Sequence, residues 1–315
     1  MISLKIIEVR SLFKRYGGVE ALRGLDLRVE EGIFGFIGPN GSGKTTTIKL
    51  LLGALRPDGG EAHVLGYDCF KESLEVRRRV GVLHEKAEYP KEMSGSEYLT
   101  FVGSLYGLRK GEARSRTNQL LESLNIKEAA DRSIGGYSAG MKQRLGLAQA
   151  LIGDPRLLLL DEPTANLDPL GRAEFLEMIK VLHRDRNVSF VIASHVLPEL
   201  QKICDQVGVI ARGVMLEQGS VADLTKKYSG NTFKVTVSNP EVLVEELRRV
   251  NFVEDTSLRD NSVWVRVSEP DRLYDEVFRI VRRKKLQLLL FQQASLDLEE
   301  LFRTLLEGKE EKEGQ

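Results

Sequence analysis

Residues 38–45 read Gly38-Pro39-Asn40-Gly41-Ser42-Gly43-Lys44-Thr45. The stretch matches the pattern G-x-x-x-x-G-K-[ST] at every fixed position, and Thr46 follows it. Its glycines let the backbone curl so that successive N–H groups point inward, at phosphate oxygens. Lys44 can then reach the β- and γ-phosphates of a nucleotide, and the hydroxyl of Thr45 can ligate Mg²⁺. The pattern therefore predicts a site for a nucleoside triphosphate.

The residues on either side of this loop predict a buried strand and a helix. Residues 33–37 form a compact apolar run that leads into Gly38. Residues 44–52 have helical spacing and stop at Gly53, with Pro57 beyond it, which is a typical helix ending. The loop is thus expected at a helix N-terminus, where the helix dipole favours an anion. An accidental glycine-rich turn would not need to lie between a buried strand and a helix.

A second segment that carries candidate catalytic residues is 157–162, which reads LLLLDE. Four leucines predict a buried strand, and ligands of open α/β sheets bind beyond the carboxyl ends of the strands. There Asp161 is expected to hold Mg²⁺ through its water shell, and Glu162 to polarise an attacking water as a general base. An apolar strand that ends in two acids often only meets solvent, so this interpretation depends on the loop at 38–45.

Strands and helices alternate along the first two thirds of the chain. Alternating or short apolar runs predict strands at 4–9, 22–29, 79–83, 189–193, 207–211 and 215–216. Helical spacing predicts helices within 93–130 and at 139–152 and 169–184. This order predicts an α/β fold with a mainly parallel sheet.

The pattern changes near residues 226–231, KKYSGN, which are predicted to be a linker. Beyond them strands and helices are predicted in the order β-α-β-β-α-β, at 232–237, 240–250, 253–258, 262–267, 270–284 and 286–292. That order is ferredoxin-like. A last helix is predicted at 296–306. The sequence thus predicts a first domain at 1–225, a small C-terminal α+β accessory domain at 232–308 and a charged tail at 309–315.

The composition excludes several classes of protein. Lys and Arg number 46 and Asp and Glu number 46, so the net charge is zero, which argues against a dedicated nucleic-acid binder. Two cysteines cannot form a disulfide framework, and the histidines at 63, 84 and 183 lack metal-ligand spacing with them. No apolar run approaches the roughly 18 residues of a membrane span, and the start MISLKIIEVR is no signal peptide. We expect a cytoplasmic protein that reaches a membrane only through a partner.

Further motifs follow in order along the chain. Tyr16 lies in FKRYGG, residues 137–141 read YSAGM, residues 165–168 read ANLD, and His195 follows the strand at 189–193. Together with the loop at 38–45 and Asp161, they make residues 4–220 resemble the nucleotide-binding subunit of ATP-binding cassette (ABC) transporters. The resemblance implies the P-loop NTPase fold of an ABC cassette, with an antiparallel β subdomain and a helical subdomain at about 86–150. It also implies ATPase activity.

The resemblance assigns a role to each motif. Tyr16 would stack on adenine, Asp168 would cross a dimer interface, and His195 would contact the γ-phosphate. Two cassettes would pair head to tail, so that the signature loop of each contacts the ATP of the other. The implied catalytic residues are Glu162, His195 and Lys44. The implied nucleotide-binding residues are Tyr16, Gly38, Pro39, Asn40, Gly41, Ser42, Gly43, Lys44, Thr45 and Thr46, and the signature loop is Ser138, Ala139, Gly140 and Met141.

The sequence departs from the family pattern at three positions. The signature carries Ala139 and Met141 where the family has glycine and glutamine, and alanine is still small enough for a close approach to phosphate. Glu85 takes the place of the usual glutamine after the strand at 79–83. An oxygen is retained there, so Thr45, Glu85 and Asp161 are the expected Mg²⁺ ligands.

The accessory region adds a further resemblance. With the closing segment 294–302, ASLDLEELF, it is similar to the C-terminal extension of cassettes from multidrug and antibiotic exporters, in which the ATPase and the permease are separate chains. The basic run at 282–285 is interpreted as a solvated helix end, with a lipid- or nucleic-acid-binding patch as the alternative.

These observations predict an ATP-hydrolysing motor subunit of an ABC exporter, with ATP and Mg²⁺ as cofactors. Its expected partners are a separate transmembrane permease, which would contact the helical insert at about 86–130, and a second cassette. The expected location is the cytoplasmic face of the cell membrane. Two alternatives stay open: a soluble ABC ATPase that acts on a macromolecular complex without a permease, and a nucleotide-binding regulator with little catalysis.

Overall fold

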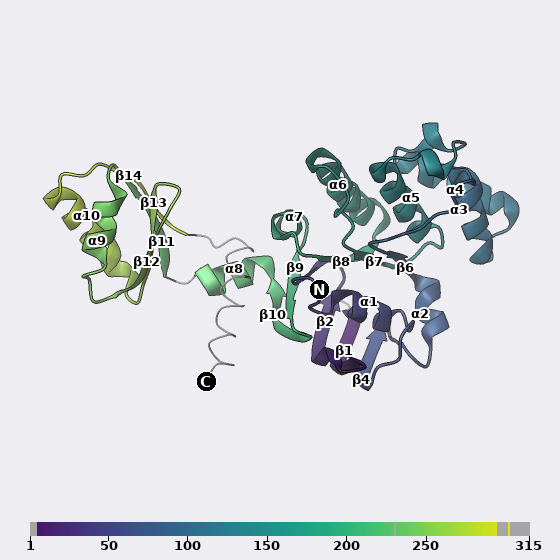
Figure 1. Ribbon diagram of the computed structural model, residues 1–315, viewed down its shortest axis with the longest axis horizontal. Helices are drawn as coiled ribbons and strands as arrows, with labels where there is room; N and C mark the ends of the chain where they lie inside the picture. The colour runs from purple at the N-terminus through teal and green to yellow at the C-terminus, as the bar shows by residue number, and fades with distance from the viewer. Residues whose placement is uncertain (1–4, 230, 295–301, 303–315) are drawn as a thin grey trace. The chain divides into compact units, whose positions relative to one another are not determined.

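The structure is a computed structural model that describes residues 5–229, 231–294 and 302. Its contacts divide the chain into two compact units, Met1–Val221 and Ala222–Gln315 (Figure 1). Residues 226–229, predicted as the start of a linker, instead continue helix α8 (Val221–Ser229). An acid in its first turn and two lysines in its last turn complement the helix dipole, which explains why this polar stretch is helical.

The first unit is built on a six-stranded sheet in the order β10-β9-β3-β8-β7-β6. The five strands from β9 to β6 are parallel, and β10 pairs antiparallel with β9. Strands β3, β7 and β8 are buried at every residue, as expected for strands covered on both faces. The strand bounds are β3 Ile33–Ile37, β6 Val80–Leu83, β7 Leu157–Asp161, β8 Ser189–Ser194, β9 Gln206–Ala211 and β10 Val214–Ser220.

A second, antiparallel sheet has the order β2-β1-β4-β5. Its strands are β1 Lys5–Tyr16, β2 Val19–Glu30, β4 Gly59–Val64 and β5 Tyr67–Asp68. The first two are longer than predicted and form one hairpin that turns at Gly17 and Gly18. Helix α1 (Lys44–Leu51) joins the two sheets, since one hydrophobic core holds Ile48 of α1 with Leu25 of β2 and Phe36 of β3.

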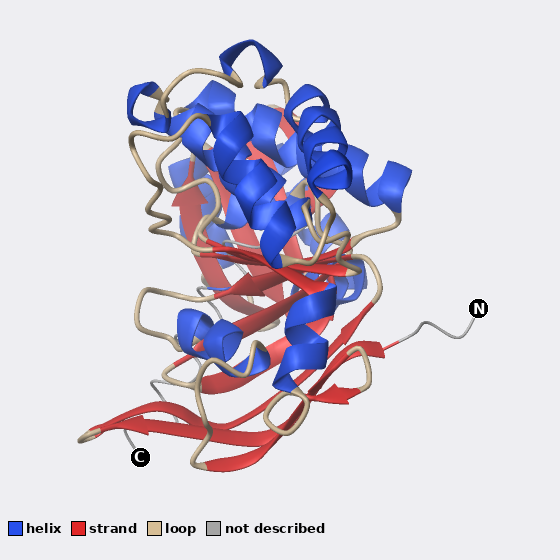
Figure 2. Cartoon of the chain, turned by 90° about the vertical axis from the view of Figure 1, so that its right-hand side faces the viewer, coloured by secondary structure: helices blue, strands red, loops and turns tan. Residues whose placement is uncertain are grey.

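Helices make up most of the remainder of this unit, and Figure 2 shows the larger group of helices above the long antiparallel strands. They are α2 Ser73–Arg79, α3 Gly95–Leu105, α4 Lys110–Ser123, α5 Ala139–Leu151, α6 Pro169–Arg186 and α7 Leu197–Gln201, with short 3₁₀ turns at Lys127–Ala129 and Ile134–Gly136. Side chains begin several of them. Ser94 and Glu97 form a capping box on α3, Ser138 caps α5 and Asp168 caps α6.

The second unit confirms the predicted β-α-β-β-α-β order. After α8 come β11 Thr232–Val237, α9 Pro240–Leu247, β12 Val253–Arg259, β13 Ser262–Val267, α10 Pro270–Arg283 and β14 Leu288–Gln293. The sheet order is β12-β13-β11-β14 with every pair antiparallel, so β13 lies between the two strands that α9 connects. The predicted helix at 296–306 falls outside the described residues except for Phe302.

The basic run at 282–285 is partly neutralised within this unit. Glu246 of α9 accepts a hydrogen bond from Arg283, and Lys284 Nζ lies 2.8 Å from Glu246 Oε1. Two of the four cations are therefore paired with an acid of the neighbouring helix, which favours the interpretation as a helix end over an open anion-binding patch. No helix in the described parts of the chain is long and apolar enough to cross a membrane.

Candidate functional site

The three segments with the predicted site residues meet at one edge of the six-stranded sheet. The loop at 38–45 follows β3, Glu162 follows β7, and His195 follows β8. These strands lie parallel in the order β3-β8-β7, and Figure 1 shows β8 next to β7. Gly38 N donates to Ser194 O at 3.4 Å, and Glu162 N donates to Ala193 O at 2.8 Å. The sheet itself therefore brings together residues that are far apart in sequence.

The loop at 38–45 has a backbone that only glycine accepts at two positions. Gly43 has φ +113°, and a Cβ added there would lie 2.7 Å from Leu22 Cδ2. A Cβ at Gly38 would lie 2.3 Å from the carbonyl oxygen of Ile210. The fixed glycines of the motif are thus required by left-handed backbone and by close packing against β2 and β9, as well as by the approach of a phosphate.

Lys44 is held inside the loop. Its ammonium donates to Gly38 O at 2.6 Å and to Pro39 O at 3.3 Å, and it lies 3.3 Å from Glu162 Oε1. The residue is only 5% exposed. A buried ammonium needs hydrogen-bond acceptors and a nearby negative charge to offset its lost hydration. These contacts hold the positive charge of Lys44 within the curl of backbone N–H groups. A triphosphate that enters this loop would meet Lys44 at its centre.

Glu162 has a strained backbone that directs its side chain. Its φ is +48°, which is uncommon for a residue other than glycine, asparagine or aspartate. Its Oε2 lies 2.9 Å from His195 Nδ1. Because a carboxylate only accepts hydrogen bonds, Nδ1 carries a proton in this contact. The carboxylate is therefore held between Lys44 and His195 in a site where it is 8% exposed.

Asp161 and Thr45 form the part of the site that suits a metal ion. Thr45 Oγ1 donates to Asp161 Oδ2 at 2.7 Å. Burial is the main cause that raises the pKa of Asp161, and the charges of Glu162 and Glu85 raise this pKa further. Glu85 comes two residues after β6, whose end at Leu83 pairs with Leu160. Its carboxylate thus acts on the same edge of the sheet.

The donor atoms fit Mg²⁺ bound together with phosphate. Within the described residues, the buried Asp161 Oδ1 and Ser42 Oγ make no hydrogen bond. Hydroxyl and carboxylate oxygens are the ligands that Mg²⁺ prefers, completed by substrate phosphates and water. No group of three or more His, Cys, Asp or Glu that could hold a metal occurs in the part of the chain that the structure describes. Mg²⁺ usually takes one or two carboxylates together with substrate phosphates and water, so the protein oxygens would supply only some of the ligands.

Tyr16 lies at the end of β1 and is 46% exposed. The turn that follows it borders a cavity of about 600 Å³, which Gly17, Gly18 and Gly41 help to line. This places the turn after Tyr16 and the phosphate-binding loop on one cavity. Lys14 Nζ lies 5.7 Å from the centre of the Tyr16 ring, so the ring already has a cation at one face.

The signature residues and Asp168 lie at helix N-termini. Ser138 Oγ accepts from Met141 N at 3.2 Å, and Asp168 Oδ1 accepts from Gly171 N at 2.7 Å. A Cβ added at Gly140 would meet only Leu167 Cδ2, at 3.9 Å, so the backbone of the signature loop is open to an approaching group. The interactions of Ser138 and Asp168 are local caps, and neither residue joins the cluster around Lys44.

Sequence reasoning missed a polar network beside this cluster. Thr164 Oγ1 donates to Glu199 Oε2 at 2.7 Å, and Arg172 Nη1 lies 3.4 Å from Glu199 Oε1. Thr164 is two residues after Glu162, and Glu199 is four residues after His195. The only signal in the sequence was the acid in the first turn of the short helix that follows His195, and its partner Thr164 is distant in sequence.

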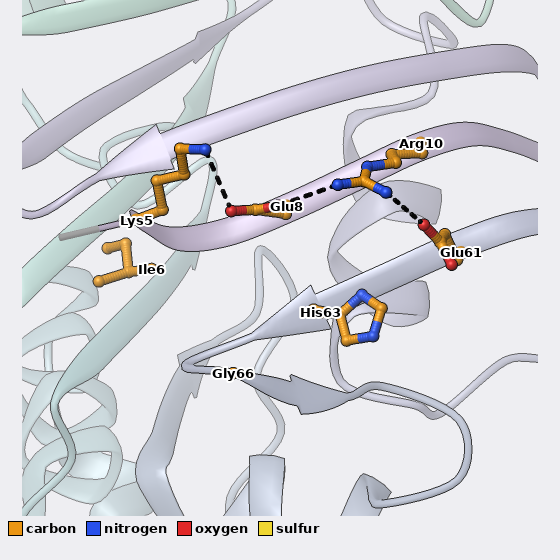
Figure 3. Close-up of a pocket in the computed structure, with 7 residues that line it drawn as sticks. All are labelled: Lys5, Ile6, Glu8, Arg10, Glu61, His63 and Gly66. Atoms are coloured by element: carbon orange, nitrogen blue, oxygen red, sulfur yellow. Dashed lines mark hydrogen bonds and ion pairs between the residues drawn. The ribbon is translucent and has the colours of Figure 1, made fainter.

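A second cavity, of about 290 Å³, lies on strands β1 and β4 and carries a different chemistry (Figure 3). Its charged side chains pair among themselves. Lys5 Nζ lies 3.4 Å from Glu8, and Arg10 lies 3.7 Å from Glu8 and 3.2 Å from Glu61. The Arg10–Glu61 pair joins β1 to β4, the other two pairs lie within β1, and we assign no ligand to this cavity.

Comparison with known proteins identifies the family to which this chain belongs. A profile of the family described as ABC transporter matches residues 22–165. The daunorubicin/doxorubicin resistance ATP-binding protein DrrA of Streptomyces peucetius is 32% identical over 96% of this chain and 92% of its own length. The bacitracin transport ATP-binding protein BcrA of Bacillus licheniformis is 38% identical over 70% of this chain and 72% of its own.

A solved structure supports the fold of the first unit. The structure of an ATP-binding subunit of an ABC transporter superposes with a TM-score of 0.63 and 26% identity, and the match covers 71% of this chain and 93% of that one. The predicted P-loop cassette fold is thereby confirmed. With relatives above 30% identity that match over most of their own length, the family is established. The chain belongs to the ABC transporter family, as an ATP-binding subunit with ATPase activity.

Proposed function

We propose that this chain is the motor subunit of an exporter for drug- or antibiotic-like compounds. The observation that carries the proposal is the extent of the match to DrrA, which covers 96% of this chain and therefore includes most of the second unit. That relative is named for resistance to daunorubicin and doxorubicin, and BcrA is named for bacitracin transport. A compound of this class, moved outward by a separate permease, is the substrate that these names favour for this chain.

The proposed chemistry assigns each residue at the sheet edge one task. The loop at 38–45 binds the phosphates of ATP, with Lys44 as the central positive charge. Glu162 accepts a proton from water as the water oxygen bonds to the γ-phosphorus and the bond to the β-phosphate oxygen breaks, which gives ADP and phosphate. Thr45 and Asp161, with Glu85, would hold Mg²⁺, which neutralises charge on the phosphates. Tyr16 would stack on the adenine.

His195 has a positioning part in this proposal. Its Nδ1–H donates to Glu162, at 2.9 Å between Nδ1 and Oε2, so it orients the carboxylate that takes the proton. The opposite edge of the ring, with Nε2, would donate to the γ-phosphate in the imidazolium form, in which both ring nitrogens carry protons. One side chain would thus join the general base to the group that is transferred.

A second cassette would complete each site. The signature residues Ser138–Met141 and Asp168 lie at the N-termini of α5 and α6, where backbone N–H groups and the dipole attract anions. In a two-fold dimer, each signature loop would meet the ATP held by the other chain. The open backbone at Gly140 supports this approach despite the departures at Ala139 and Met141.

The permease would dock on the helical part of the first unit. Helix α3 and the residue after it expose three large apolar side chains, Phe101, Leu105 and Tyr106, with exposed fractions of 53%, 70% and 43%. Apolar groups gathered on one surface are typical of a protein contact. Docking of this kind would hold the chain at the cytoplasmic face of the membrane.

The test is a pull-down of tagged Glu162→Gln protein from detergent-solubilised native membranes with Mg-ATP. Slow hydrolysis should keep the ATP-bound dimer on its permease, so a protein with several membrane spans should appear in near-equal amount. Lys44→Ala is the matched control, because it should lose ATP and with it the ATP-dependent part of the recovery. Recovery of only ribosomes, nucleic acid or soluble proteins would contradict the exporter and leave the ATPase assignment intact.

A further inference from the structure

The loop between Glu162 and Asp168 is fastened to the short helix that follows His195. The hydroxyl of Thr164, a residue that is 2% exposed, donates to Glu199 Oε2 at 2.7 Å. Glu199 lies on α7, and its side chain is 14% exposed. A short hydrogen bond from a buried hydroxyl to a carboxylate is among the stronger side-chain interactions. The start of the loop at 163–168 is therefore tied to α7.

Arg172 fastens the other end of the same loop. Its Nη1 lies 3.4 Å from Glu199 Oε1, and its Nε donates to the carbonyl oxygen of Leu167 at 2.9 Å. The Glu199 carboxylate thus uses one oxygen for each end of the loop. Leu167 directly precedes Asp168, the residue that is expected to reach the second cassette. The position of Asp168 consequently depends on the position of Glu199.

The segments 162–168 and 195–199 are therefore joined twice. The first connection is Glu162 with His195, at 2.9 Å, and the second is Thr164 with Glu199, at 2.7 Å. The first serves the general base, and the second serves the loop that carries Asp168. A displacement of His195 toward the γ-phosphate would move α7, and with α7 the loop.

We propose that Glu199 is a positioning residue for ATP hydrolysis. Through Thr164 and Arg172 it couples the segment of His195 to the loop of Asp168. The presence of a γ-phosphate in one cassette would thereby control whether the Asp168 loop of that cassette is positioned for dimerisation. Glu199 touches neither nucleotide nor water in this role. The inference rests on the proposed roles of His195 and Asp168. The experiment is chosen so that failure of the inference and failure of the proposed function give different results.

A purely structural role of Glu199 would change a different set of measured properties. If Glu199 only satisfied buried polar groups, its loss would lower the melting temperature and impair nucleotide binding and turnover together. A positioning role instead predicts unchanged binding of ATP to a single cassette. It predicts losses only in the steps that need Asp168, namely ATP-driven dimerisation and turnover.

The experiment compares Thr164→Val, Thr164→Ser and Glu199→Gln in the full chain. Thr164→Val keeps the shape and removes the donor, while Thr164→Ser keeps the donor. Glu177→Gln is the control, since Glu177 is an exposed acid of α6 whose side chain is 66% exposed. The readouts are the affinity for a fluorescent ATP analogue, kcat and KM for ATP, the melting temperature, and light scattering of ATP-induced dimers in a Glu162→Gln background.

The expected result for Thr164→Val and Glu199→Gln is a fall in kcat and in the dimerisation constant of about tenfold, the size expected for one buried hydrogen bond. Nucleotide affinity should stay within about twofold of wild type, and Thr164→Ser should restore both losses. Wild-type kcat and dimerisation in Thr164→Val and Glu199→Gln, or equal losses of affinity and kcat, would overturn the inference, while ATP hydrolysis by the wild-type protein would leave the proposed function standing. Failure of the wild-type protein to hydrolyse ATP would overturn the proposed function first.

Discussion

Lys44 Nζ lies 3.3 Å from Glu162 Oε1, so the cation of the phosphate-binding loop and the proposed general base form a buried ion pair. Their side chains are 6% and 9% exposed. A γ-phosphate that reaches Lys44 must compete with this carboxylate and is repelled by it. The Glu162 carboxylate thus weakens the binding of ATP but is needed for its hydrolysis. Removing the charge of Glu162 should separate these two effects.

We predict that Glu162→Gln binds ATP more tightly than wild type and hydrolyses it about 10²- to 10⁴-fold more slowly. The slower rate follows from loss of the general base, and the tighter binding from loss of the competing negative charge. Titration with a fluorescent ATP analogue and steady-state phosphate release measure the two effects. Glu177→Gln is the control, with unchanged values expected. Equal, near-zero rates in wild type and Glu162→Gln would favour the nucleotide-binding regulator over the ATPase motor.

Glycines around the phosphate site provide a matched pair of substitutions. Gly43→Ala places a Cβ at a φ of +113°, 2.7 Å from Leu22 Cδ2 and 2.9 Å from the carbonyl oxygen of Ala21. Gly18→Ala adds a Cβ with no atom within 4 Å, on the turn that borders the same side of the site. We predict that Gly43→Ala abolishes measurable ATP binding and destabilises the first unit by about 1–3 kcal/mol.

The measurement is nucleotide titration together with thermal unfolding followed by circular dichroism. Gly18→Ala should retain both the affinity and the melting temperature of wild type. Normal ATP binding by Gly43→Ala would show that the loop can shift to admit a Cβ, which would contradict the packing argument.

Local signals in the sequence predicted most of the elements. Strands β11 and β13 have the predicted bounds because alternating valines lie between strong turn residues. Asp260 and Asn261 have φ values of +46° and +59°, as a tight turn between β12 and β13 requires. The phosphate-binding loop was predictable because its chemistry fixes glycine, lysine and threonine at set spacings.

Long-range contacts were not predictable in the same way. Thr164 and Glu199 are 35 residues apart and meet only because β7 and β8 are neighbours in the sheet. Likewise, the lysines at 226 and 227 suggested a polar linker, whereas they complete the last turn of α8. Composition alone does not distinguish a polar helix from a polar connection, since both expose charged side chains.

We predict that neither cysteine reacts with thiol reagents in the native protein at pH 8. Cys69 is fully buried, and burial raises the pKa of its thiol to about 12; burial likewise raises the pKa of Cys204. The thiolate is the reactive form, so both residues lack access and ionisation. A colorimetric thiol titration should give no fast reaction in buffer and two thiols per chain in denaturant. A fast native reaction would show that the packing around one of the two cysteines opens readily.

The ion pairs of the second unit can be tested by fluorescence, because the single tryptophan of the chain, Trp264, lies on β13. Its fluorescence therefore reports on the unfolding of this unit within the full chain. Hydrogen bonding to Lys284 and the charges of Arg283 and Arg249 hold the pKa of Glu246 below its usual value. A lowered carboxyl pKa stabilises the fold above the unfolded pKa, and this stabilisation is lost as the pH falls through the folded pKa.

We predict that Glu246→Gln lowers the melting temperature reported by Trp264 at pH 7. The difference from wild type should shrink as the pH falls below the ordinary carboxyl pKa of about 4.5, because wild-type Glu246 then becomes neutral as well. Glu254→Gln is the control, since that acid forms an exposed pair with Arg266, at 3.5 Å, and should shift the melting temperature little. A difference that persists unchanged into acid would mean that Glu246 acts through shape and hydrogen bonding, and that its charge contributes nothing.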